Sequence, residues 1–354
     1  MRDKRIVSQM FYVARILLKR KGSVLIFALW VIAFLGVFAV QIGLKIRQRI
    51  VLVSRLENRS QLRFAAESGI KKAIGVLKLD REKSQMGDSP ESKTYRYNNK
   101  NSFGNIPVGK GMCQVRYLFF DGASLDPELR YGVVDEESKI NINVAEKNIL
   151  KSLIGHAAIL DDDRAQELTE AIIDWREFGQ SQITSFYSDE YYANLKYPYP
   201  PKDSEFELID ELLLVRGFHQ DVFEKLIPFI TIYGDGRVNI NTASENVLMA
   251  LGLDEAIVQK ILFVRRGGDG LEATSDDYIF QKTYDVASEL INFVELEASE
   301  IKQIDALNAA GKIKTNSSYY LIQSQAELNQ RESLTSICVY NINNNRIEYW
   351  REKF

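Results

Sequence analysis

The chain has 354 residues, with 45 Lys and Arg against 48 Asp and Glu and a formal net charge of -3. Hydrophobic residues make up 45% and charged residues 26%, which excludes a disordered, collagenous or multi-span membrane protein. Two His and two Cys leave little material for a zinc site or a disulfide framework.

The small net charge hides two opposite charges. Residues 1–81 carry 17 Lys and Arg against 4 Asp and Glu, so residues 82–354 carry the remaining 28 basic and 44 acidic side chains. An acidic body repels a polyanion over most of its surface, which argues against broad nucleic-acid binding.

Residues 23–44 contain no charged side chain. A helix of this length spans about 33 Å at a rise of about 1.5 Å per residue, enough for one bilayer crossing. It is apolar on all sides, unlike most core helices, and longer than the apolar part of a cleaved signal peptide. The basic residues before it favour a cytoplasmic N-terminus, although Lys45, Arg47 and Arg49 reduce the difference in charge.

The apolar pattern continues beyond the span. Ile46, Ile50 and Val53, and then Leu62, Ala66, Ile70, Ala73 and Leu77, follow at intervals of three or four residues. These positions share one helix face, and no Pro occurs before residue 90. The sequence predicts one continuous helix over 24–79, with 23–44 in the membrane and 45–80 beyond it.

Stretches of β-branched and aromatic residues predict strands on both sides of a long middle portion. They are 112–120, 130–143, 317–326, 334–341 and 345–351, and a short candidate strand lies at 94–97. The run Asn343-Asn344-Asn345 predicts a tight hairpin turn.

The middle portion contains an internal repeat. Residues 140–150 read ININVAEKNIL and residues 238–248 read VNINTASENVL, which predicts two copies of one supersecondary unit. In each copy the Asn pair is expected to tie the entering loop to the backbone, and Thr242 or Ser244 is expected to cap the second helix. Further helices are predicted at 164–178, at 207–216 before Gly217, at 221–230 and at 253–265.

Lys21-Gly22 before the apolar run resembles the prepilin-peptidase site of type IV pilins and type II secretion pseudopilins. That resemblance implies cleavage after Gly22 and a mature N-terminus at Ser23. Most members have Glu at mature position five, which is Phe27 here. This departure resembles the K-type minor pseudopilin.

The body resembles the same family in order along the chain. The matching pieces are the two Asn-Ile-Asn-x-Ala stretches, Ile173-Asp174-Trp175, Tyr191-Tyr192 and Glu211 to Gly217. The resemblance implies an α+β, pilin-like fold with a long N-terminal transmembrane helix and an antiparallel sheet. Its pilin-like parts would be 81–143 and 313–354, interrupted at 144–312 by an all-α domain with two related SAM-like or helix-hairpin-helix-like modules.

The implied function is a non-enzymatic minor pseudopilin at the pseudopilus tip, helping to start assembly for protein export. Residues 1–22 would be a cytoplasmic leader, and the body would lie in the periplasm below a single inner-membrane pass. The implied partners are minor pseudopilins of the I, J and H types, the major pseudopilin, prepilin peptidase and the inner membrane, with no nucleic acid. A minor pilin of a type IV pilus or DNA-uptake system is the alternative.

A second alternative is a membrane-anchored DNA-binding protein, because residues 247–266 resemble a helix-hairpin-helix. That motif grips phosphates at a helix N-terminus. Asp254 and Glu255 follow its hairpin and would repel phosphate, which favours a packing role.

Calcium is the cofactor that the sequence suggests, since hard cations bind clustered oxygen ligands. The segment 267–278 concentrates Asp269, Glu272, Asp276 and Asp277 around glycines, without EF-hand spacing. A plain solvated acidic loop is the alternative interpretation.

The family resemblance implies further calcium ligands in the helical domain, at Asp174 and at the later pair Asp189 and Glu190. Arg176 and Phe178 stand where the family has acidic residues, which departs from the first of these sites.

The remaining reactive side chains form no catalytic set. His156 and His219 are isolated in the sequence. Cys113 and Cys338 both fall in predicted strands, where they are either two free buried thiols or, in an oxidising periplasm, a disulfide.

Overall fold

The computed structural model describes residues 21–85, 98–120, 127–177, 188–272, 274, 276–328 and 332–354. Residues 1–20 of the predicted leader and the candidate strand at 94–97 lie outside this range. The chain divides into two compact units, Met1–Gln61 and Leu62–Phe354.

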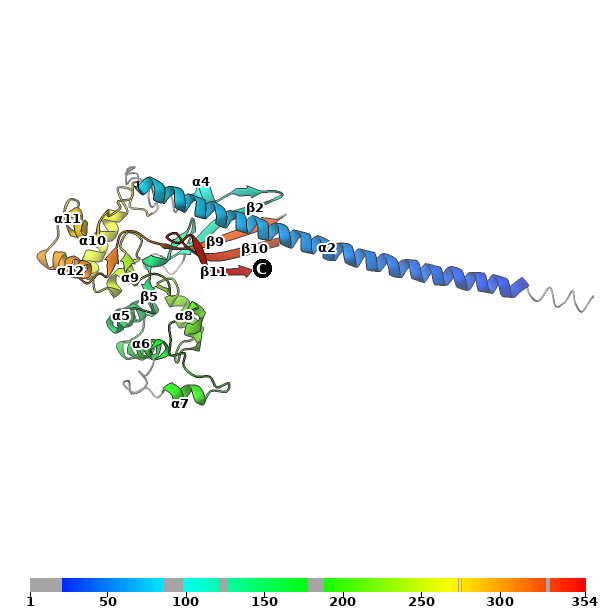
Figure 1. The fold of residues 1–354 in the computed structure, drawn as a ribbon, viewed down its shortest axis with the longest axis horizontal. Coiled ribbons are helices and arrows are strands. Elements are labelled where there is room, and N and C mark those ends of the chain that lie inside the picture. Colours follow the sequence, from blue (N-terminus) through cyan, green and yellow to red (C-terminus); the bar gives the residue numbers. More distant parts are fainter. Residues whose placement is uncertain are drawn as a thin grey trace, which may run out of the picture. The chain divides into compact units, whose positions relative to one another are not determined.

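The first unit consists of the N-terminal part of α2 (Lys21–Gln85), the long blue helix of Figure 1. The predicted helix over 24–79 is confirmed and extends further at both ends. Its best window has a mean hydropathy of 2.6 with none of its residues buried, so by length and composition it is able to cross a membrane.

The second unit begins with the last turns of α2, which pack on a sheet. Leu62, Ala66, Ile70, Ala73 and Leu77, the five positions of the predicted apolar face, are all buried there. The spacing of apolar residues by three or four positions therefore predicted correctly which face of α2 contacts the sheet. Gly69 lies on the same face, where a Cβ would collide with Ser324 Oγ and approach Cys113 Sγ to 3.1 Å.

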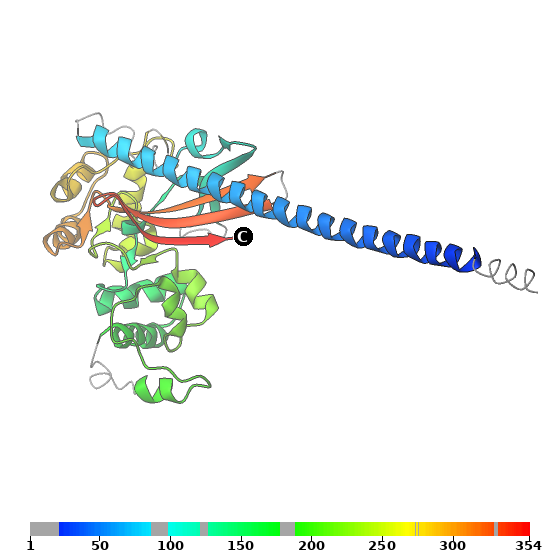
Figure 2. The same ribbon diagram turned by 45° about the vertical axis from the view of Figure 1, so that its right-hand side comes forward.

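The sheet is antiparallel throughout, with the order β1-β2-β9-β10-β11; β3 also pairs with β2, and β4 pairs with β9 (Figures 1 and 2). The bounds are β1 (Ile106–Val108), β2 (Gly111–Phe119), β3 (Glu128–Tyr131), β4 (Val134–Asp135), β9 (Tyr319–Leu328), β10 (Glu332–Asn341) and β11 (Arg346–Lys353), with α4 (Lys100–Phe103) before β1. The antiparallel sheet and the hairpin through Asn343 to Asn345 are confirmed.

The single strand predicted over 130–143 is wrong. This stretch forms β3, β4, the 3-10 helix η2 (Glu136–Ser138) and β5 (Ile140–Asn141). Asp135 Oδ1 accepts the backbone N–H of Glu137 at 2.9 Å, which turns the chain out of the sheet. The chain returns to the sheet at β9, the partner of β4, so the whole helical region enters between two paired strands.

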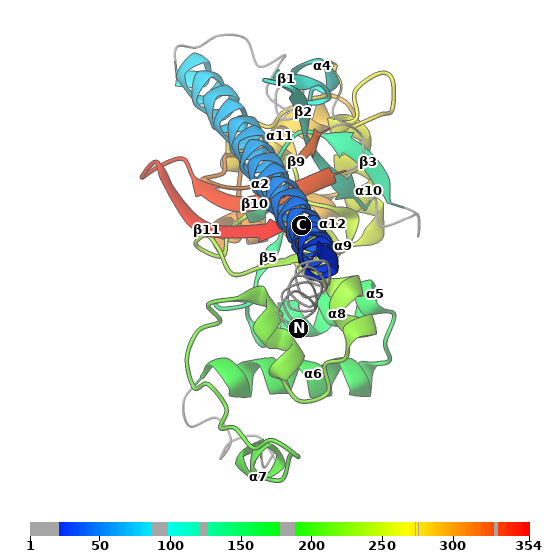
Figure 3. The same cartoon turned by 90° about the vertical axis from the view of Figure 1, so that its right-hand side faces the viewer.

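The helical region contains two modules, defined as module 1 (140–231) and module 2 (238–314). Module 1 contains β5, α5 (Lys147–Ala158), α6 (Asp162–Arg176), α7 (Ser188–Ala193), η4 (Ile209–Leu214), α8 (Gln220–Leu226) and β6 (Ile230–Thr231). Module 2 contains β7 (Val238–Asn239), α9 (Glu245–Ala250), α10 (Glu255–Arg265), η5 (Thr283–Asp285), α11 (Val286–Ile291), α12 (Ala298–Ala309) and β8 (Ile313–Lys314). They share one apolar core, and Figure 3 shows α5, α6 and α8 grouped apart from the strands of the sheet.

Three helical predictions need correction. The region is not purely α-helical, because β5 pairs with β6 and β7 with β8 as short parallel ladders. The helix predicted over 207–216 is the 3-10 helix η4, since the Glu211 carboxylate accepts the N–H groups of Glu207 and Leu208 and tightens the turn. The helix predicted over 221–230 ends at Leu226, two residues before Pro228.

Candidate functional site

The residues predicted for processing lie at the start of α2. Gly22 and Ser23 belong to its first turn, and Phe27 follows with 70% of its surface exposed. Within the described part of the first unit no side chain buries Phe27, which presents an apolar ring where the pilin pattern has a carboxylate.

The Asn pairs of the repeat hold equivalent loops in the two modules. The Asn143 side chain donates to Phe206 O at 3.0 Å and accepts from Phe206 N at 2.8 Å. Asn241 makes the same two bonds with Phe280, at 2.9 and 2.8 Å. The predicted role is confirmed for these two amides, whose bonds are equivalent in the two modules. The first Asn of each pair differs, since Asn141 donates to backbone carbonyls and Asn239 to the side chains of Asp135 and Ser317.

In each module an arginine donates hydrogen bonds to backbone carbonyl groups of this loop. Arg176 donates to Ile142 O and Ala145 O at 2.6 and 2.9 Å. Arg265 donates to the matching carbonyls of module 2, Ile240 O and Ala243 O. Arg176 stands where the family resemblance implied an acidic residue, and here it satisfies two carbonyl groups of its own module.

The expected cap of α9 is not formed by either candidate. Ser244 occupies the N-cap position but makes no side-chain capping bond. The Thr242 hydroxyl donates to Asp135 Oδ2 at 2.6 Å instead. The buried Asp135 carboxylate is a stronger acceptor, so the Thr242 hydroxyl bonds to it and does not cap α9.

Asp135 joins the sheet to module 2. Its Oδ2 accepts from Thr242, from Asn239 Nδ2 at 2.9 Å and from Ser317 Oγ at 2.6 Å. Burial raises the pKa of Asp135, while these side-chain donors oppose the rise. The carboxylate thus connects β4, the entry of module 2 and the segment that returns to β9.

Glu136 and Glu137, which follow Asp135, bind the last residues of the two modules. Glu136 pairs with Lys139 at 2.6 Å and accepts from Thr231 at the end of module 1. Glu137 pairs with Lys314 at the end of module 2 and accepts from Ser318 N. We call Asp135, Glu136 and Glu137 the polar joint, because both modules and the sheet meet at these three carboxylates.

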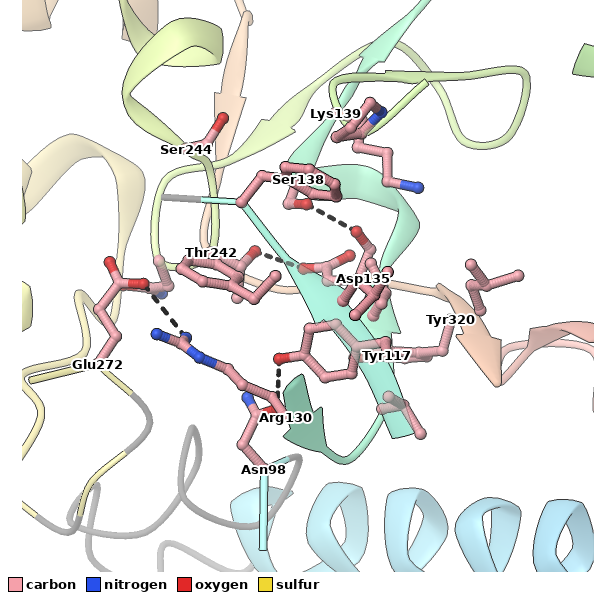
Figure 4. A pocket seen from close by; sticks show the side chains of 18 of the residues that line it. Asn98, Tyr117, Arg130, Asp135, Ser138, Lys139, Thr242, Ser244, Glu272 and Tyr320 are labelled. Carbon is pink, nitrogen blue, oxygen red and sulfur yellow. Dashed lines mark hydrogen bonds and ion pairs between the residues drawn. The ribbon is translucent and has the colours of Figure 1, made fainter. Parts of the chain in front are cut away.

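A pocket of about 340 Å³ lies beside the polar joint, between the sheet and the modules (Figure 4). Glu272 lies between two arginines, 3.0 Å from Arg265 Nη2 and 3.6 Å from Arg130 Nη1. The Arg130 guanidinium stacks on the Phe119 ring at 3.5 Å. The charged groups of the pocket therefore pair with one another, an arrangement that fixes the modules against the sheet.

Tyr117 lines this pocket and donates a hydrogen bond to Asn98 Oδ1. Burial raises the pKa of Tyr117 to about 12, so its phenol stays protonated and acts as a donor.

The loop predicted to bind calcium is organised by Asp276. Its Oδ2 accepts Gly268 N at 2.8 Å and Asp269 N at 3.0 Å. Thr274 Oγ1 lies 2.7 Å from Asp276 Oδ1 and 3.1 Å from Asp277 Oδ1. The Thr274 hydrogen bond is the main cause that lowers the pKa of Asp276. This loop brings Asp269, Asp276 and Asp277 near one another, whereas Glu272 points to the arginine pair.

The other predicted ligands lie in module 1. Asp174 is buried on α6, and Glu190 is exposed on α7. Asp189 also lies on α7, where its side chain is outside the described range. Across the described residues, no three His, Cys, Asp or Glu side chains gather as they would around a metal ion.

The two cysteines are free and buried. They lie on β2 and β10, on opposite sides of β9, where Cys113 is in register with Ala326 and Cys338 with Ile322. Two strand spacings and an offset along β9 separate them by far more than the roughly 7 Å limit between the Cα atoms of a disulfide. The alternative of two free thiols is therefore the correct one.

Sequence reasoning missed the polar joint and the two arginines. Glu136 and Glu137 were assigned to a strand, although consecutive acidic residues in an otherwise β-branched stretch are a signal for its interruption. The arginines had a clearer signal, since each follows its repeat at the end of the second helix, but the intervening lengths differ between the copies.

The known proteins agree with this architecture. The model of the family "Type II secretion system (T2SS), protein K" matches residues 132–235. This segment of the chain is similar to the type II secretion system protein K family. Type II secretion system protein K of Pectobacterium carotovorum subsp. carotovorum is 31% identical over 87 residues, 24% of this chain and 26% of that protein. The Aeromonas hydrophila protein of the same name is 32% identical over 102 residues, 27% of this chain and 31% of that protein.

These alignments span less than a third of either relative. A structural likeness extends much further: the GspK-GspI-GspJ complex from the type 2 secretion system of enterotoxigenic Escherichia coli contains a chain matched with a TM-score of 0.57. At 15% identity it covers 85% of this chain and 98% of that chain, and it shows the fold. The family match, over residues 132–235, includes the polar joint and module 1.

Proposed function

We propose that the chain is a minor pseudopilin of a type II secretion system, a structural subunit without an enzymatic reaction. The observation that carries this proposal is the insertion of two equivalent helical modules between paired strands β4 and β9, in a chain whose matched segment begins beside this insertion. The family match and the likeness to a chain of the GspK-GspI-GspJ complex support it.

The location follows from α2. Its apolar first part anchors the chain in the inner membrane by a single pass, and the body lies in the periplasm. The basic residues up to Lys21 support a cytoplasmic N-terminus. Prepilin peptidase cleaves after Gly22 and releases Ser23, and the helix then enters a bundle with the major pseudopilin and the I, J and H types.

The position in the assembly follows from Phe27. In the pilin pattern a Glu at this place pairs with the N-terminal amine of a neighbouring subunit, and a phenyl ring makes no such pair. A buried amine without a partner is costly, so the chain fits where no subunit lies above it. The bulky modules favour the same place, the tip of the pseudopilus, where the chain helps to start assembly.

The test is an intact-mass measurement on the protein extracted from membranes, with and without the peptidase. Loss of residues 1–22 only when the peptidase is present is the expected result. A protein that retains its first 22 residues beside an active peptidase would contradict the proposal. Deletion of the gene should also stop export of folded substrates, and the wild-type gene should restore it.

Calcium binding remains a proposal from the sequence, with Asp269, Asp276 and Asp277 as its ligands and Asp174, Asp189 and Glu190 as a second set. Among the described residues, neither set gathers as three carboxylates would around a metal ion. Calorimetric titration with calcium alone tests the proposal. A heat of binding in the wild type that is lost in Asp269→Asn would support calcium binding by the loop. No heat of binding in the wild type would contradict the proposal.

A further inference from the structure

Ile159 adopts an uncommon backbone conformation at the turn between α5 and α6. It ends α5 in the left-handed region, at φ 56° and ψ 57°. A β-branched residue is a genuine outlier there, because its Cβ crowds the carbonyl that follows. Its side chain is 78% exposed, so burial does not compensate for the conformation.

Module 2 shows what the same turn looks like without this strain. In module 1 the turn reads Ile159-Leu160-Asp161, and in module 2 it reads Gly252-Leu253-Asp254 before the next helix. Gly252 has φ 97°, a value that glycine adopts without a Cβ penalty. The fold therefore accepts glycine at this place, and module 1 carries a solvent-exposed isoleucine instead.

The charges around Ile159 indicate what kind of surface it meets. Asp161, Asp162 and Asp163 follow it and are exposed. Lys151 pairs with Asp162 at 2.7 Å, and Lys225 donates to the carbonyl of Ala158 at 3.4 Å, a bond that leaves its charge in place. Asp161 and Asp163 together outweigh that one charge, so this apolar tip is complementary to an apolar socket with a basic rim.

A second copy of this chain is a poor match for such a tip. Residues 82–354 carry 44 acidic against 28 basic side chains, so two bodies repel each other.

We propose that Ile159 is a docking anchor, inserted into an apolar socket rimmed by Lys or Arg on a different protein of the secretion machinery. The proposal rests on the proposed function. The strained isoleucine is retained for contact with that protein, because folding alone is better served by glycine or asparagine. This surface belongs to module 1 and not to α2, through which the chain enters the helix bundle.

The experiment uses the full chain in cells that lack their own copy of the gene. A photoreactive amino acid replaces His156, an exposed residue on the last turn of α5. Cross-linking is compared between wild-type Ile159, Ile159→Asn and Ile159→Val, and the secreted fraction of a type II substrate is measured alongside. Leu271→Asn is the matched control, since Leu271 is 63% exposed and lies elsewhere.

We expect the wild type and Ile159→Val to cross-link to another component of the secretion system. Ile159→Asn should reduce that product roughly tenfold or more, as the loss of a buried aliphatic side chain implies. The melting temperature of Ile159→Asn should be no lower than that of the wild type, because Asn tolerates this backbone conformation. Leu271→Asn should leave cross-linking and secretion unchanged.

Three outcomes would overturn the proposal: undiminished cross-linking and secretion by Ile159→Asn, a fall in its melting temperature that accounts for the loss, or a cross-link to a second copy only. Failure of the wild-type gene to restore secretion would instead contradict the proposed function. The two failures are therefore distinguishable.

Discussion

At the scale of single residues, Gly69 sets how closely α2 approaches the sheet. Alanine has the better helix propensity, by about 1 kcal/mol, but its Cβ would meet Ser324 and Cys113 in a packed interior. We expect Gly69→Ala to destabilise the protein by about 1–3 kcal/mol despite that gain. Thermal melts of the detergent-solubilised chain measure the effect.

Gly75 provides the matched control. It lies on the same helix, and among the described residues no atom beyond its chain neighbours and its own helix backbone lies within 4 Å of the place that a Cβ would occupy. Gly75→Ala should therefore raise the melting temperature. The Ser324→Ala background should reduce the cost of Gly69→Ala, because the colliding hydroxyl is absent. Equal effects of the two alanine substitutions would contradict the close approach.

Asp235 gives the protein a pH dependence with a defined sign. Burial acts to raise its pKa, but hydrogen bonds from Arg237 and the charge of Lys314 outweigh it and lower the pKa to about 2. The unfolded chain has the ordinary value near 4, so this contribution is full above that value and is lost as the pH falls towards 2.

Asp235→Asn should therefore be less stable than the wild type at neutral pH, with a difference that shrinks between pH 4 and pH 2. Melting temperatures across this range measure it. Asp305→Asn removes the same charge from an exposed position on α12 and serves as the control. A constant difference at every pH would show that Asp235 acts without its charge.

At the scale of elements, Arg176 and Arg265 each donate hydrogen bonds to the loop that precedes the first helix of their module. Arg265→Met would leave two buried carbonyl groups without their donor and Glu272 with Arg130 as its remaining arginine, at a cost of about 3–5 kcal/mol. Arg176→Met should cost less, about 1–3 kcal/mol, because its charged partner Glu177 is 41% exposed. Chemical denaturation of both variants gives the comparison, and equal losses would contradict the argument from burial.

The elements also show where sequence reasoning works. The face of α2 was predictable residue by residue, since helix periodicity and burial obey the same interval of three or four residues. The Asn pairs were predictable because each contains a local motif, in which the first Asn side chain accepts the backbone N–H of the second. Their bonds to Phe206 and Phe280, far along the chain, were not predictable. The polar joint was not, because Asp135 depends on Asn239, Thr242 and Ser317, which only the fold brings together.

The same distinction applies to the candidate site. Asp276 and Asp277 were correctly placed in one acidic loop, but backbone amides and Thr274 occupy their oxygens, and Glu272 turns to Arg265. Spacing alone does not show which way a carboxylate points. The processing residues depend on a short motif beside an apolar run, and that kind of signal requires no tertiary structure.

At the scale of the whole molecule, the two charge classes of the sequence correspond to two tasks. The basic, apolar part of α2 belongs to the first unit, and the acidic residues belong mainly to the body. The last turns of α2 belong to the body by their packing, since they supply one face of the core that contains Phe103, Val115 and Ile322. The boundary between the units therefore lies inside a helix, near Gln61.

This boundary leads to a prediction about truncation. Residues 62–354 retain the buried face of α2 and the ion pair between Arg63 and Glu352 at 2.7 Å, so they should fold as a soluble monomer that unfolds cooperatively. Residues 86–354 lack that helix and expose the apolar face of the sheet, so they should aggregate. Light scattering during size-exclusion chromatography and near-ultraviolet circular dichroism distinguish the two. A monomeric, cooperatively folded 86–354 would show that α2 serves the membrane and the bundle alone, and the helix would then have no part in the core of the body.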